Sequence, residues 1–95
     1  MDNLITDNIL LKNGFERNEI PVHKNIWSIE NYRSYTLWLD DLKIDMMWKF
    51  TNNNADWHMH IDNDRCETIG SADINDVEQF NLMMKVFKSN FKLNV

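Results

Sequence analysis

The sequence predicts an α+β fold in which one antiparallel sheet of four to five strands carries an N-terminal helix and a C-terminal helix on one face. Three observations predict it: a short apolar segment that ends at a glycine, a central run of alternating apolar and polar residues, and a C-terminal apolar stripe at helical spacing. No linker, repeat or change in composition divides the chain, so residues 1–95 are expected to form a single domain.

The first helix is expected over about Asp2–Asn13. Its apolar side consists of Leu4, Ile5, Ile9, Leu10 and Leu11. Gly14 follows at the position where a helix often ends in a left-handed residue, and Phe15 can fold back onto the last turn. Residues 16–24 then read as a loop, which contains Pro21.

The segment 26–50 is expected to form strands, with Asp40 and Asp41 as a two-residue turn. This turn pairs Leu39 with Leu42, Leu37 with Ile44, Tyr35 with Met46 and Arg33 with Trp48 on one face. The opposite face carries the pairs Trp38 with Lys43, Thr36 with Asp45 and Ser34 with Met47. Because the first set is nearly all apolar, it predicts the face that lies on the core.

A second hairpin is expected from the strand Trp57–Asp62, whose residues alternate. Trp57, Met59 and Ile61 would point inward, and His58, His60 and Asp62 outward. If Asp62 pairs with Arg65 across the turn, Cys66 lies opposite Ile61 and Glu67 lies opposite His60. Cys66 is therefore expected to be a buried, inert thiol.

The last helix is expected to begin at Asn75, with Glu78 reaching back to complete a capping box. Its apolar residues recur at spacings of three and four: Val77, Phe80, Met84, Phe87 and Phe91. This stripe should cover the inner face of the sheet.

Composition restricts the function classes. Hydrophobic residues make up 43% of the chain, enough for a core, and Cys66 is the only cysteine, so no intramolecular disulfide can form. The net charge of −5 disfavours nucleic acid as a partner. The first residues resemble neither a signal peptide nor a membrane span, so a soluble protein of the cytoplasm is expected.

Three stretches together resemble small uncharacterised α+β proteins that are encoded by prophages and mobile elements of gut bacteria. They are residues 10–15 at the end of the first helix, 57–62 as a strand, and 66–71 leading to Val77 and Glu78. The resemblance implies an origin, and it brings no activity and no catalytic residues.

The spacing of His58 and His60 is one candidate for chemistry. On a strand both side chains share a face, and Glu67 across the hairpin could join them as a third ligand of zinc or another divalent transition metal. A solvated strand face explains the same residues and is the favoured interpretation. A calcium loop after Asp62 is excluded, because Glu67 stands where glycine must make the turn.

Enzymatic chemistry lacks candidate residues. The aspartate pairs fall in turns or beside a helix start, where aspartate is favoured for bonding its own backbone. The sequence has no phosphate-binding glycine loop, no nucleophile elbow and no zinc-type cysteine spacing. No catalytic residue is predicted, and the protein is not expected to be an enzyme.

The aromatic residues of the outer face suggest recognition. The hairpin register sends Trp38 outward, and Tyr32, Met47 and Ile69 are expected on the same face. Cover by the 16–24 loop or by a second copy is one explanation, and a separate protein partner is the other. The leading hypothesis is a non-enzymatic protein-binding module, such as a phage-type adaptor or inhibitor. The alternatives are a metal-binding protein and a structural homodimer.

Overall fold

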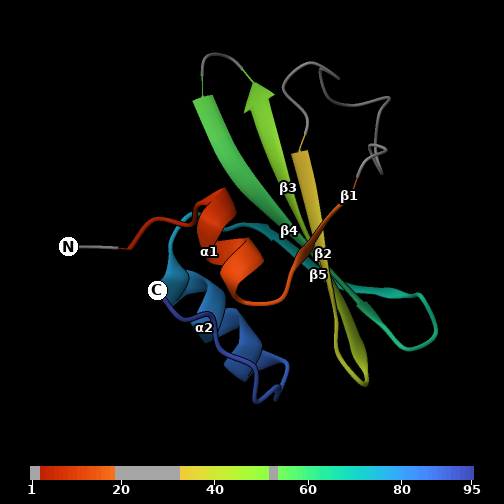
Figure 1. Ribbon diagram of the computed structural model, residues 1–95. Coiled ribbons are helices and arrows are strands. Elements are labelled where there is room, and N and C mark those ends of the chain that lie inside the picture. Colours follow the sequence, from red (N-terminus) through yellow and green to blue (C-terminus); the bar gives the residue numbers. More distant parts are fainter. Residues whose placement is uncertain (1–2, 19–32, 52–53) are drawn as a thin grey trace.

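The computed structural model describes residues 3–18, 33–51 and 54–95, and it has the expected α+β architecture (Figure 1). Five antiparallel strands lie in the order β1-β2-β3-β4-β5, so each strand pairs with its neighbour in the chain. The strands are β1 (Glu16–Asn18), β2 (Arg33–Trp38), β3 (Leu42–Thr51), β4 (Asn54–Asn63) and β5 (Thr68–Asp73), and the helices are α1 (Asp7–Lys12) and α2 (Val77–Val86).

The β2–β3 hairpin has the predicted register. Arg33 lies opposite Trp48, and the pairing continues without a shift to Trp38 opposite Lys43. The turn closes with a hydrogen bond of 2.8 Å from the Leu39 N–H to the Leu42 carbonyl. The inner face therefore carries the apolar residues of both strands, as the alternation predicts.

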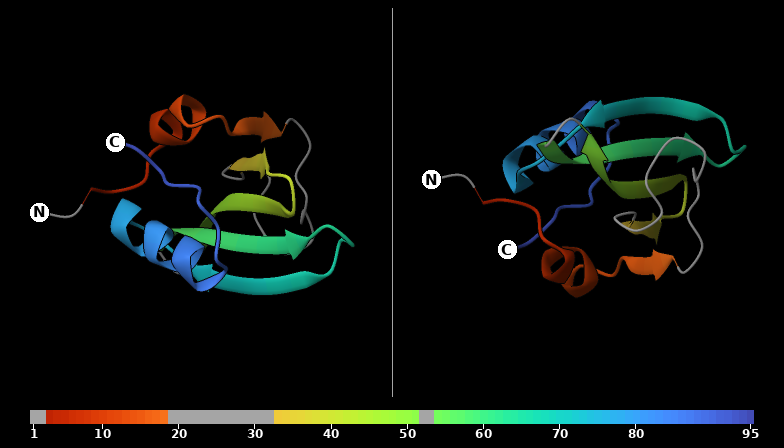
Figure 2. Two further views of the ribbon diagram at one scale, coloured as in Figure 1. Left: turned by 90° about the horizontal axis from the view of Figure 1, so that it is seen from below. Right: turned by 90° about the horizontal axis from the view of Figure 1, so that it is seen from above.

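Both helices and the C-terminal segment lie on the inner face of the sheet (Figure 2). They enclose one core, in which Leu10 of α1, Phe80 and Met84 of α2, and residues of β2, β3 and β4 are almost fully buried. The buried sheet residues are Tyr35, Leu37, Leu42, Ile44, Met46, Trp57, Met59 and Ile61. Residues Trp57, Met59 and Ile61 thus point inward, as predicted.

Helix α1 begins five residues later than predicted. Thr6 has extended backbone angles and its side chain accepts a hydrogen bond from the Ile9 N–H, so it caps the helix. Residues before it run beside the start of α2, where the Ile5 N–H donates to the Asn75 carbonyl at 2.8 Å. Gly14 has φ of +94°, which confirms the left-handed end of the helix.

The predicted cap of helix α2, Asn75, is wrong, because Asp76 caps the helix. The Asp76 side chain accepts from the Gln79 N–H at 2.7 Å. The Asn75 side chain is engaged elsewhere, because its oxygen accepts from the Trp57 N–H at 3.0 Å. The helix ends at Val86, before the last two residues of the predicted stripe.

The segment after α2 turns back toward α1 and completes the core. Phe91 lies beyond the helix, yet its ring packs on Phe15 and Phe80 at centroid distances of 6.4 and 6.1 Å. Leu93 is buried, and paired hydrogen bonds of 2.8 and 2.9 Å join Asn13 to the backbone of Asn94. The apolar residues of the stripe therefore all pack in or against the core, although the last two of them lie beyond the helix.

Two strand predictions need correction. Glu16–Asn18, predicted as loop, forms the edge strand β1, with Arg17 opposite Tyr35. The β4–β5 turn is longer than predicted, because Asp62 pairs with Thr68 and not with Arg65. The cause is local: the Asn63 side chain accepts hydrogen bonds from two backbone N–H groups of the turn, at 2.9 and 3.0 Å.

This longer turn changes the position of the cysteine. Cys66 was predicted to be buried opposite Ile61, but it is exposed and has a φ of +62°. Ile61 instead lies opposite Gly70. Glycine at position 70 leaves room for the Phe87 ring, since a Cβ atom there would lie 2.5 Å from it.

Candidate functional site

The outer face of the sheet is arranged in rows that cross the strands. One row runs Thr36, Asp45, His60 and Ser71, and the next runs Ser34, Met47, His58 and Asp73. A third row consists of Trp38, Lys43, Asp62 and Thr68. The face is therefore polar over most of its width, and it ends in a tryptophan near the β2–β3 turn.

The two histidines of the predicted metal site share the outer face, but Glu67 does not lie opposite them. His60 lies opposite Ser71, and Glu67 belongs to the β4–β5 turn, where its carboxylate accepts from the Asn63 side chain at 3.1 Å. His58 Nδ1 lies 2.9 Å from an Asp73 oxygen. Within residues 3–18, 33–51 and 54–95, no three His, Cys, Asp or Glu side chains are grouped to hold a metal.

His60 takes part in a chain of hydrogen bonds along the β4–β5 hairpin. The Thr68 hydroxyl donates to an Asp62 oxygen at 3.0 Å, and His60 Nε2 lies 3.2 Å from the same hydroxyl. When the hydroxyl donates to the carboxylate, the Thr68 oxygen can still accept a hydrogen bond from His60 Nε2 in the tautomer that carries its proton there. This arrangement orients the imidazole.

The centre of the outer face is buried. Asp45 is 3% exposed, and its carboxylate accepts from the Thr36 hydroxyl at 2.5 Å and lies 3.6 Å from the Lys43 ammonium. Met47, which was expected on a recognition surface, is only 1% exposed. This part of the face is therefore closed to a large partner.

Trp38 has the opposite character, because it is 69% exposed at the end of β2. The Lys43 ammonium lies over its ring, 5.3 Å from the centroid. The Asp40–Asp41 turn follows directly, and both aspartates are exposed. The described surface therefore presents an exposed indole next to two carboxylates.

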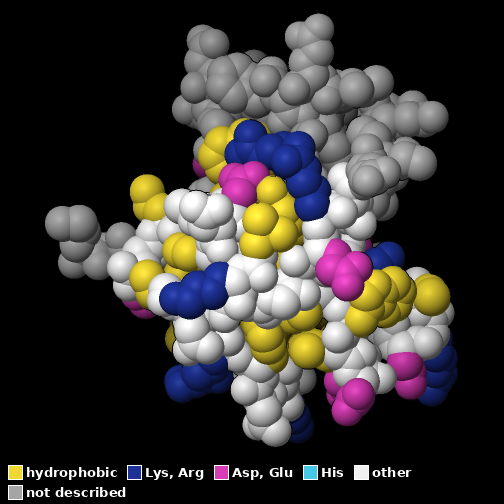
Figure 3. Space-filling model, in the orientation of Figure 1, with side chains coloured by type: hydrophobic (Ala, Val, Ile, Leu, Met, Phe, Trp, Pro, Cys, Tyr) yellow, Lys and Arg dark blue, Asp and Glu magenta, His cyan; other side chains and the backbone are white. Residues whose placement is uncertain are grey.

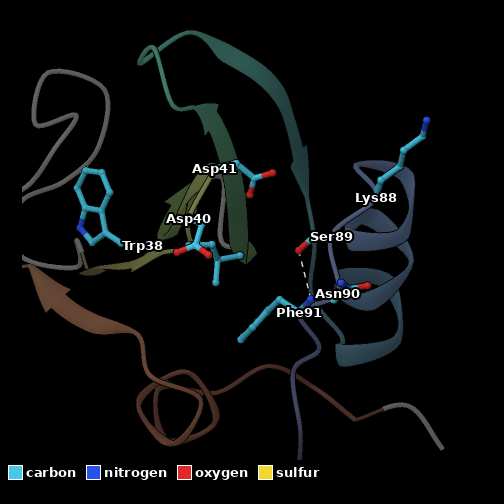
Figure 4. A pocket seen from close by; sticks show the side chains of 8 residues that line it. Trp38, Asp40, Asp41, Lys88, Ser89, Asn90 and Phe91 are labelled. Atoms are coloured by element: carbon cyan, nitrogen blue, oxygen red, sulfur yellow. Dashed lines mark hydrogen bonds between the residues drawn. The ribbon is translucent and has the colours of Figure 1, made fainter.

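Two hollows meet at this turn. The first, of about 410 Å³, lies between Trp38–Asp41 and the segment Lys88–Phe91 (Figure 4). The second, of about 190 Å³, lies between the same turn and the β4–β5 hairpin, and it is lined there by Asp62, Asn63, Asp64 and Cys66. The turn therefore forms a ridge with a hollow on each side.

The side chains around the first hollow differ in direction. Trp38 points away from the C-terminal segment and forms the rim, while Asp40 and Asp41 project from the turn (Figure 4). On the other side of the hollow, the Phe91 N–H donates to the Ser89 hydroxyl at 3.2 Å (Figure 4), and this bond stabilises the segment that lines the hollow there. The Lys88 side chain extends away from the aspartates (Figure 4).

Of the four residues predicted to bind a partner, three lie among the described residues, and these three do not form one exposed surface. Ile69 is 40% exposed on β5, at the irregularity between β4 and β5, and two strands separate it from Trp38. Met47 is buried, as described above. Tyr32 lies outside the described residues. Trp38 is the predicted residue that lies on an open surface beside hollows.

An ionic cluster on the inner face was not predicted. Asp7 of α1 lies 2.9 Å from Arg33 Nε and accepts from Arg33 Nη2 at 3.2 Å, and it also accepts from the Tyr35 hydroxyl at 2.5 Å. The guanidinium lies 4.9 Å from the centroid of Trp48. Burial, and then the bond to Asp7, raise the pKa of the Tyr35 phenol above its ordinary value.

This cluster joins α1 to the sheet, with the Arg33 and Asp7 side chains 32% and 36% exposed and the tyrosine inside. Tyr35 is 1% exposed, and the Trp57 indole beside it donates to the Ile5 carbonyl at 3.0 Å. No sequence signal could identify it, because the residues are 26 and 28 positions apart and belong to different elements. Its geometry is that of a structural clamp.

Neither helix of the described residues has the length and apolar character needed to cross a membrane. The chain matches no protein-family model, no curated protein and no solved structure.

Proposed function

We propose that this chain is a non-enzymatic protein-binding module that contacts its partner through the surface around Trp38. The observation that supports the proposal is the exposure of Trp38, at 69%, on a ridge between two hollows. Among the aromatic residues on the inner face of the sheet, Tyr35 and Trp57 are each 1% exposed, and Trp48 is partly buried against the core. The core therefore does not account for this tryptophan.

An exposed indole on a ridge suits recognition for a physical reason. Tryptophan offers a large, rigid apolar surface with few rotatable bonds, so its burial by a partner releases water at a small entropic cost. The hollows on either side give a partner concave surface to fill, which raises the contact area around the ring. A phage-type adaptor or inhibitor, the expected role, would use such a surface on a host protein.

Capture of partners tests this proposal. The tagged chain and its Trp38→Ala and Leu82→Ala variants are incubated with lysate of the source organism, and bound proteins are quantified. Leu82 is a matched control, because it is a large apolar residue of α2 that is 64% exposed. We expect a partner that the unaltered chain and Leu82→Ala retain and that Trp38→Ala loses by about tenfold or more.

Other outcomes would overturn the proposal. No partner that depends on Trp38, or equal loss in both variants, would contradict recognition through this surface. Light scattering on the same samples measures the mass, and a doubled mass that Trp38→Ala abolishes would identify a homodimer instead. Zinc, manganese or iron at one equivalent in protein purified without a histidine tag would favour the metal-binding alternative.

A further inference from the structure

We infer that the partner presents arginine or lysine side chains to the ridge around Trp38. This inference rests on the proposed function and specifies its partner class. It follows from the cation that already lies on the indole, from the carboxylates of the ridge and of the smaller hollow, and from the position of the two hollows beside the ridge.

The first observation is the contact between Lys43 and Trp38. The ammonium lies 5.3 Å from the ring centroid, within the range at which an aromatic face attracts a cation. The Lys43 ammonium also lies 3.6 Å from the Asp45 carboxylate, and this ion pair holds the lysine side chain in place. The indole therefore already contacts one cation, and because Trp38 is 69% exposed, the rest of its ring is open to a side chain of a partner.

The second observation is the charge around the ridge. Asp40 and Asp41 line both hollows, and Asp62 and Asp64 line the smaller one. Of the two lysines that also line them, Lys43 is paired with Asp45 and Lys88 extends away from the turn (Figure 4). Among the residues that the structure describes, no cation pairs with Asp40, Asp41 or Asp64.

The surface is complementary to a segment of a protein. The lower right of Figure 3 shows hydrophobic atoms next to acidic ones over the β2–β3 and β4–β5 turns, with basic atoms at the outer edge. A guanidinium can stack on an indole and pair with a carboxylate at the same time, because it is planar and carries its donors at the edge. A segment across the ridge would place one side chain on Trp38 and its neighbours over the two hollows.

A titration followed by NMR tests the inference. The full chain, labelled with ¹⁵N, is titrated with a capped peptide of alternating arginine and glycine, and separately with the matched peptide of glutamate and glycine. We expect shifts at the Trp38 indole and at the Asp40 and Asp41 amides with the arginine peptide alone. Binding should weaken between about 0.01 M and about 0.15 M salt, because the Debye length falls from ~30 Å to ~8 Å.

Two single-charge variants supply the control. Asp41→Asn removes one charge from the ridge and introduces asparagine, a residue type that is common in turns. Glu78→Gln removes one charge from the exposed face of α2. We expect Asp41→Asn to raise the dissociation constant about threefold. Glu78→Gln should leave it unchanged, and Trp38→Ala should abolish the local shifts.

Several results would overturn the inference: no shift at the ridge, equal shifts with both peptides, or equal effects of the two charge variants. Calcium or magnesium chloride that displaces the peptide at one equivalent would assign the carboxylates to a metal ion. If the peptide fails while capture still depends on Trp38, the cationic partner class is wrong and the binding module stands. If capture does not depend on Trp38, the proposed function itself fails.

Discussion

Removal of the Tyr35 hydroxyl should destabilise the fold measurably. In Tyr35→Phe the ring stays in place, and the bond of 2.5 Å to Asp7 is lost. A hydrogen bond to a charged group contributes about 1.5–3 kcal/mol. The Asp7 side chain is 36% exposed, so water can replace part of the interaction, and we expect a loss of about 1.5–2 kcal/mol in the free energy of unfolding.

Thr68→Val provides the matched control, because it also removes a hydroxyl that donates to a carboxylate. Thr68 is exposed, and its bond to Asp62 is 3.0 Å long, so we expect a cost below about 0.5 kcal/mol. Guanidinium unfolding measures both, with tryptophan fluorescence as the signal, since Trp57 is buried. Equal costs for the two variants would refute the claim that the Asp7 cluster clamps α1 to the sheet.

The stabilisation that the Tyr35–Asp7 hydrogen bond gives to the fold depends on pH, and the pKa of Tyr35 fixes its direction. The pKa of an unfolded tyrosine is about 10, and folding raises the pKa of Tyr35. Between the two values the unfolded chain has lost a proton that the folded chain retains. This contribution is therefore complete below about pH 10 and is lost as the pH rises through the folded-state pKa. The difference in stability between the unaltered chain and Tyr35→Phe should shrink above about pH 10.

The other predictions concern single packing, capping and exposure features. Gly70→Ala should lower the free energy of unfolding by about 1–2 kcal/mol, because the new Cβ would lie 2.5 Å from the tip of the Phe87 ring. The loss should be smaller in a Phe87→Leu background, and denaturant unfolding measures both. Asp76→Ala should cost about 1 kcal/mol through loss of the cap on Gln79, and an unchanged thermal midpoint would contradict this assignment. Cys66 should react with a thiol reagent in the native protein, and reaction only after denaturation would show that it is buried.

The parts of the fold that could be predicted are those whose determinants are close together in the chain. The β2–β3 register follows from alternation on both sides of Asp40 and Asp41, and the end of α1 follows from Gly14. Each feature depends on a few neighbouring residues with one steric solution.

The parts that could not be predicted depend on competition or on distant partners. Asn75 and Asp76 are both residue types that cap helices well. The Asn75 side chain accepts a hydrogen bond from the Trp57 N–H, which leaves Asp76 to cap the helix. Similarly, the Asn63 side chain lengthens the β4–β5 turn and thereby exposes Cys66. Alternation shows which face Met47 occupies, but its burial depends on tertiary packing.

The sequential order of the strands has a consequence for how the chain folds. Every strand pairs with its neighbour in sequence, and the connections from β2 to β5 are short, so these four strands can pair by closing short loops, each at a modest entropic cost. The helical layer differs, because the bonds between Asn13 and Asn94 span 81 positions. During synthesis on a ribosome the sheet could therefore pair early, whereas the layer over its inner face can close only after residues 93–95 have emerged.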